Sequence, residues 1–189
     1  MGESSEITGE RKITMSAKIT NEQAGSPSSV PPAIHLRKIL APVDFSAHSS
    51  KALDYVRAFA QQFNAAVVLV HVVEPTVIPD NFGVVPPAYE QVGDVLRKTA
   101  EERLRRLAGE LGVRTGAVQW EVCTGRAAWE IVRVAEECAV DLIVITTHGY
   151  TGLKHVLMGS TAELIVRHAP CPVLTVRTPA RDFVAATKE

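Results

Sequence analysis

The residues best suited to chemistry lie in one glycine-marked segment, Ile145 to Glu163. Gly149 and Gly159 bracket nine residues, and Ser160 stands where a helix N-cap belongs, with Glu163 at capping-box spacing. Glycine lets a backbone approach a ligand closely, and the first N–H groups of a helix suit a phosphate. The segment therefore predicts an anion site. A tight loop with a purely structural cap fits the same spacing.

A carboxylate, Asp44, follows the first apolar run of the chain, Ile39 to Val43. At the end of a strand it can accept from ribose hydroxyls or hold Mg²⁺ through water. It can equally cap the following helix, unless Ser46 takes that role and leaves the aspartate for a ligand. His148 can contact a phosphate, but no acid stands beside it, so we predict no general base and no catalytic residue.

Alternating strands and helices must position these residues. The predicted strands are four apolar runs and one run of period-two alternation, and they fall at 39–43, 66–73, 118–122, 142–145 and 172–176. Helices are predicted from Ser46, over 89–111, from Gly125 and over about 160–168. This alternation implies right-handed βαβ units and a parallel sheet.

The apolar character of each strand predicts its place in the sheet. Fully apolar runs belong to strands covered on both faces, and alternation belongs to a half-exposed strand. A doubly wound order 3-2-1-4-5, with helices on both faces, satisfies this test. Ligands of such sheets bind where the strand order reverses, which here places Val43 and Asp44 beside Thr146 to Gly149.

The longest helix shows the clearest periodicity of the chain. Its apolar residues recur at spacings of three and four, which predicts one buried face. They are Tyr89, Val92, Leu96, Ala100, Leu104, Leu107 and Leu111.

Composition excludes several classes of protein. The chain has 20 Lys and Arg against 21 Asp and Glu, so it lacks the basic excess of a nucleic-acid binder. No apolar run is long enough to cross a membrane, and Met1 to Thr20 lacks the apolar core of a secretory signal. Three cysteines without C-x-x-C spacing exclude a disulfide framework and a zinc site and favour reduced thiols. We therefore expect a cytoplasmic protein that binds neither nucleic acid nor membrane.

The chain divides by composition into a polar tail over 1–35, predicted to be disordered, a folded domain over 36–178 and a C-terminal tail over 179–189. The fifth strand is apolar although it is predicted at an edge, and bare apolar edges invite pairing. A second copy of the chain, paired through residues 172–177 in a two-fold dimer, would cover it. Coverage by the C-terminal tail is the alternative.

Three familiar nucleotide and signalling folds fail on their motifs. The first turn, Pro42 to His48, contains no glycine, whereas a Rossmann dehydrogenase needs G-x-G-x-x-G there. No G-x₄-G-K-[ST] string exists for a P-loop, and the third strand ends in Cys123 rather than in a receiver aspartate.

The chain resembles the universal stress protein (UspA-like) family over about 36–177. The resemblance rests on Pro42-Val-Asp-Phe-Ser46, Val70-His-Val72, Thr147-His-Gly149 through Gly159-Ser160, and the closing Arg167-His-Ala-Pro-Cys-Pro-Val-Leu174. It implies five parallel strands in the adenine-nucleotide α-hydrolase-like fold and dimers formed through strand 5. In one branch of the family it also implies bound ATP.

The ATP-binding branch has the pattern G-x2-G-x9-G-[ST]. Its later positions match Gly149, Gly159 and Ser160, but Thr146 replaces the first glycine and adds a branched side chain beside the ribose. The resemblance implies a nucleotide site of eleven residues. They are Pro42, Val43, Asp44, Val72, Ile145, Thr146, His148, Gly149, Gly159, Ser160 and Thr161.

Two functions therefore remain open. The first is a homodimeric stress-response protein that binds ATP, with Mg²⁺ held by Asp44 and the phosphates, and that signals by occupancy, with at most slow ATPase activity. The second is a UspA-like dimer in which Thr146 keeps nucleotide out, so that the protein acts only as an interaction module for another protein.

Overall fold

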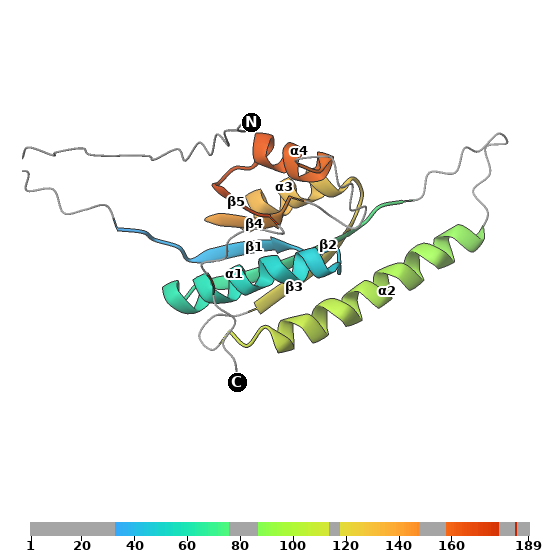
Figure 1. Ribbon diagram of the computed structural model, residues 1–189. Helices are drawn as coiled ribbons and strands as arrows, with labels where there is room; N and C mark the ends of the chain where they lie inside the picture. The colour runs from blue at the N-terminus through green and yellow to red at the C-terminus, as the bar shows by residue number, and fades with distance from the viewer. Residues whose placement is uncertain (1–32, 76–86, 114–117, 148–157, 178–183, 185–189) are drawn as a thin grey trace, which may run out of the picture. The chain divides into compact units, whose positions relative to one another are not determined.

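The computed structural model describes residues 33–75, 87–113, 118–147, 158–177 and 184, and the side chains of 87–91 lie outside this description. Strands and helices alternate along the chain (Figure 1). The elements are β1 (Lys38–Pro42), α1 (Ala47–Phe63), β2 (Ala66–Val73), α2 (Pro87–Glu110), β3 (Val118–Thr124), α3 (Ala127–Glu137), β4 (Leu142–Thr146), α4 (Ser160–His168) and β5 (Val173–Val176).

The strands form one parallel sheet in the order β3-β2-β1-β4-β5, which confirms the predicted order. The central strands are buried as their apolar runs require: Ile39 and Leu40 of β1 and Ile143 of β4 have no exposed surface. The strand order reverses between β1 and β4. β2 and β3 are added on one side of β1, and β4 and β5 are added on the other.

Helices cover both faces of the sheet (Figure 1). On one face, α1 and α2 pack on a cluster that includes Val144, and on the other, α3 and α4 pack on a cluster that includes Ile143 and Ile145. Successive side chains of a strand point to opposite faces. The same alternation therefore assigns Thr146 to the face of α1 and α2.

The turn after β1 is held by side-chain hydrogen bonds. Of the two capping residues left open by the sequence, Ser46 is the N-cap of α1, and its hydroxyl oxygen accepts from the Ser49 N–H at 3.2 Å. Asp44 is also engaged, because its Oδ1 accepts from the Ser46 N–H at 3.0 Å and from the Ser46 hydroxyl at 2.6 Å. Between them Phe45 has a φ of 59°, a left-handed conformation uncommon for an aromatic residue.

The start of α4 differs from the prediction. Helix α4 spans the predicted residues, but its N-cap is Gly159, and Ser160 is the first helical residue. The capping box is therefore absent: no side chain of the described residues caps this helix, and the Glu163 carboxylate accepts from Arg167 at 2.9 Å instead. Gly125 likewise stands one residue before the N-cap of α3, Arg126.

The predicted buried face of α2 holds over its second half only. Ala100 and Leu104 are buried, whereas Val92 and Leu96 are 52% and 48% exposed. The periodicity of a helix shows which residues share a face. How much of that face is buried depends on how far the sheet extends beneath the helix. The side chain of Tyr89 lies outside the described residues.

Two further observations concern the described part of the chain. None of its helices is long and apolar enough to cross a membrane. Val184, the one described residue of the predicted C-terminal tail, packs against the core on the α1 and α2 face.

Candidate functional site

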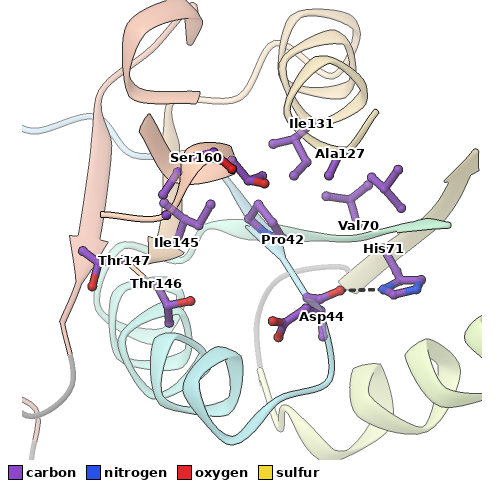
Figure 2. A pocket seen from close by; sticks show the side chains of 15 residues that line it. Pro42, Asp44, Val70, His71, Ala127, Ile131, Ile145, Thr146, Thr147 and Ser160 are labelled. Carbon is purple, nitrogen blue, oxygen red and sulfur yellow. Dashed lines mark hydrogen bonds between the residues drawn. The ribbon is translucent and has the colours of Figure 1, made fainter. Parts of the chain in front are cut away.

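A cavity of about 250 Å³ opens at the carboxyl ends of the central strands, where the strand order reverses. β1, β2 and β4 supply its floor, and the first turns of α3 and α4 supply its walls (Figure 2). This is the place at which doubly wound sheets bind ligands. Thr147 and Gly159, which flank the undescribed residues and the adjoining Met158, both line this cavity.

The structure brings nine of the sequence-predicted site residues together around the cavity. They are Pro42, Val43, Asp44, Val72, Ile145, Thr146, Gly159, Ser160 and Thr161. The other two, His148 and Gly149, lie outside the described residues.

Sequence reasoning missed five residues that also line the cavity, which are Val70, His71, Ala127, Ile131 and Ala162. Thr147 also lines it and lies within the range Thr146 to Gly149 that the strand order placed at the ligand position. Ala127 and Ile131 come from the first turns of α3, which crosses back over the sheet after the edge strand. The right-handedness of βαβ crossovers predicts the face on which α3 lies, and this signal was available in the sequence.

The N-terminus of α4 faces the cavity without a capping side chain. The Gly159 N–H donates to the Thr147 carbonyl at 2.8 Å, which ties the helix start to the end of β4. The N–H groups of Ser160 and Thr161 have no acceptor within the helix, and the positive end of the helix dipole lies here. This corner therefore suits an anion such as a phosphate.

The N-terminus of α3 is different, although it borders the same cavity. Glu74, beyond the end of β2, places its Oε1 2.9 Å from the Ala127 N and accepts its hydrogen bond. A carboxylate thus already satisfies and neutralises this helix start. Consequently the two ends of the cavity differ in charge, and an anionic ligand group is favoured at α4 rather than at α3.

The backbone of Val72 offers a second recognition element. The Val43 N–H donates to the Val70 carbonyl at 2.8 Å, and the ladder between β1 and β2 ends there. Backbone groups of alternate residues in a strand point to the same side. The N–H and C=O of Val72 therefore point in the same direction as those of Val70, toward the position that β1 would occupy if it continued. No described residue hydrogen-bonds to them on that side. They present one donor and one acceptor to the cavity.

Asp44 is the acidic residue among those that line the cavity. Its bonds to Ser46 fix the carboxylate at the start of α1. Both roles weighed for this residue therefore coexist: it supports the helix start and borders the cavity.

Thr146 lines the cavity without occupying the corner at α4. Its side chain belongs to the face of α1, by the alternation along β4, whereas Ser160 lies on the opposite face. Figure 2 shows the Ile145 side chain on the side of Ser160 and Thr146 apart from it. The alternation along β4 therefore turns the branched side chain to the face opposite that of α4.

Comparison with known proteins gives one family. The family model described as the universal stress protein family matches residues 35–177. Universal stress protein MJ0531 of Methanocaldococcus jannaschii is 35% identical over 149 residues, which cover 77% of this chain and 85% of that protein. A solved structure of MJ0577, from the same organism, is 30% identical with a TM-score of 0.68, covering 78% of this chain and 100% of that chain.

A universal stress protein solved in complex with cAMP has a TM-score of 0.52, covers 77% of this chain and 99% of its own, and at 20% identity shares the fold. The family model, the sequence relatives and the solved structures agree. The chain belongs to the universal stress protein family.

Proposed function

We propose that this protein binds ATP in the cavity between α3 and α4 and acts in the stress response by occupancy rather than by turnover. One observation carries the proposal: the uncapped N-terminus of α4 lies across a single cavity from the donor–acceptor pair of Val72. The first suits phosphates and the second suits the edge of a base.

The charges around the cavity orient the nucleotide. The phosphates bind at Ser160 and Thr161, because α3 already holds the carboxylate of Glu74. The base then lies against Val72 and the apolar first turns of α3, and the ribose lies near Asp44. Pro42 and Ile145 form the floor beneath it.

Mg²⁺ is proposed as a companion of the phosphates. Among the described residues no group of three or more His, Cys, Asp or Glu is arranged to hold a metal ion. Mg²⁺ is commonly held by one or two carboxylates together with substrate phosphates and water, and Asp44 supplies one such carboxylate.

Two measurements on the purified protein test the proposal. We expect heat denaturation of freshly purified protein to release an adenine nucleotide, which chromatography of the supernatant identifies. We also expect ATP to raise the melting temperature of nucleotide-free protein. An empty supernatant together with an unchanged melting temperature would favour the interaction module without nucleotide.

We further propose that the protein is a homodimer formed through β5. This strand is an edge of the sheet. The Pro172 carbonyl accepts from Ile143 of β4, and the Val176 carbonyl accepts from Thr147, the residue after β4. The backbone groups of Val173 and Thr175 therefore point outward, where a second copy can pair with them. In such a dimer, each copy keeps a surface to which a protein partner can bind. Through that surface the partner responds to whether nucleotide is bound.

Thr175→Pro tests this interface with a matched control. Proline removes an outward N–H and leaves the bonds to β4 intact, whereas Thr175→Val keeps that N–H. Light scattering after size exclusion should give a dimer for the wild type and for Thr175→Val and a monomer for Thr175→Pro. A dimer in all three would exclude pairing through β5.

The cytoplasm is the proposed location. Cys123, Cys138 and Cys171 are free thiols, and reduced cysteines are typical of that compartment. Fractionation of cells that express the full chain tests this assignment, and recovery of the protein from a membrane or extracellular fraction would refute it.

A further inference from the structure

His71 lies beside the cavity but has no part in the proposed binding of phosphate, ribose or base. It belongs to β2, and its Nδ1 lies 2.7 Å from the Val43 carbonyl oxygen (Figure 2). A carbonyl only accepts, so Nδ1 carries the proton and donates it. The bond therefore joins the His71 side chain to Val43, the residue at which the hydrogen bonds between β1 and β2 end.

The hydrogen-bond partner of His71, the Val43 carbonyl oxygen, is the acceptor of the next bond that a continued ladder between β1 and β2 would contain. In a parallel ladder the Val43 N–H bonds to Val70, and the next bond would run from the Val72 N–H to the Val43 carbonyl. The first bond is present at 2.8 Å, and the second is absent from the described residues. The carbonyl is instead turned toward the imidazole of His71.

The imidazole is itself held in place from the α2 side. The Phe45 ring packs on it with ring centroids 4.6 Å apart, and the Arg103 guanidinium lies 3.9 Å above the Phe45 ring. The left-handed φ of 59° at Phe45 brings its ring to this position. Backbone strain of this kind persists where surrounding contacts determine it.

We infer that His71 is a positioning residue for the base: by holding the Val43 carbonyl, it keeps the Val72 N–H free to donate to the ligand. The inference rests on the proposed function and extends it to base recognition. The Val72 N–H donates to a ring nitrogen of the base, and the Val72 carbonyl accepts from the exocyclic amine. The Watson–Crick edge of adenine carries both partners, the N1 acceptor and the N6–H₂ donor.

Removal of the imidazole donor should make the Val72 N–H unavailable to the ligand. In His71→Leu the Val43 carbonyl regains the Val72 N–H, and the ladder extends by one bond. In His71→Asn the amide places an N–H donor at the same position in the side chain as Nδ1, so this variant should retain the wild-type arrangement. The pair separates the loss of the donor from the loss of the ring.

A nucleotide analogue isolates the bond in question. In 1-deaza-ATP a C–H replaces the ring N1, so it lacks the acceptor for the Val72 N–H. Calorimetry with the full chain should show ATP binding the wild type and His71→Asn about tenfold more tightly than the analogue, the size of one hydrogen bond. For His71→Leu, ATP and the analogue should bind equally, both about as weakly as the analogue binds the wild type.

The outcomes separate the two proposals. A purely structural role for His71 would weaken ATP and 1-deaza-ATP by the same factor in His71→Leu and leave the tenfold preference intact, which would overturn the inference alone. Equal binding of the two nucleotides by the wild type would also overturn it while leaving ATP binding established. Failure of the wild type to bind ATP would refute the proposed function and the inference together.

Discussion

Gly159 offers a graded perturbation of the proposed phosphate corner. Its φ of −67° and ψ of 150° are accessible to any residue, so its glycine is not required by the backbone. A Cβ at this position would lie 3.4 Å from the Thr147 carbonyl oxygen, an ordinary contact. One methyl group therefore fits. A leucine side chain must extend past that oxygen or into the cavity that Gly159 lines.

The expected effect follows from linkage. At an ATP concentration of 100 times the wild-type Kd, binding stabilises the native state by about 2.7 kcal/mol. For a domain of this size each kcal/mol raises the melting temperature by roughly 2–4 °C, so the wild type should gain roughly 5–11 °C. Gly159→Ala should keep most of that gain, and Gly159→Leu should lose nearly all of it.

Differential scanning calorimetry of the three proteins, with and without ATP, measures this directly. Both variants should melt within a few degrees of the wild type when nucleotide is absent, which controls for folding. A gain for Gly159→Leu equal to that of the wild type would place the phosphates away from α4 and refute the reasoning.

Three further outcomes are expected. Ile165→Ala should lower the free energy of unfolding in urea by about 2–5 kcal/mol, because Ile165 has no exposed surface; a loss below about 1 kcal/mol would contradict its place in the core. Burial, followed by a hydrogen bond to Glu121, raises the pKa of the Cys123 thiol to about 12, so its contribution to stability is complete below the ordinary value of 9.0 and is lost as the pH rises toward 12. Cys123→Ala should therefore show a shallower loss of stability over that range, and an unchanged slope would refute this assignment. Asp44→Ala removes the Oδ1 acceptor of the Ser46 N–H and hydroxyl and should weaken ATP binding in calorimetry about tenfold or more; unchanged affinity would remove Asp44 from the site.

The strand order was predictable because burial on both faces leaves an apolar run in the sequence. β1 and β4 show such runs, and β3 alternates as an edge strand should. The same order brought residues from the ends of β1, β2 and β4 to one cavity, so most of the proposed site followed from topology and from the family motif.

The remaining details depend on tertiary contacts that no local pattern encodes. Ser160 matched a capping box, yet Glu163 pairs with Arg167, and the extended backbone of Gly159 takes the cap position. Val92 and Leu96 matched a buried face but are about half exposed. The open backbone groups of Val72 depend on where the β1 ladder ends, which the sequence does not mark.

A crystal structure of the full chain grown with saturating ATP tests the central claim most directly. The account predicts triphosphate density within hydrogen-bonding distance of the Ser160 and Thr161 N–H groups, with the base against Val72. An empty cavity under those conditions, or phosphates beside Glu74 at the start of α3, would contradict it.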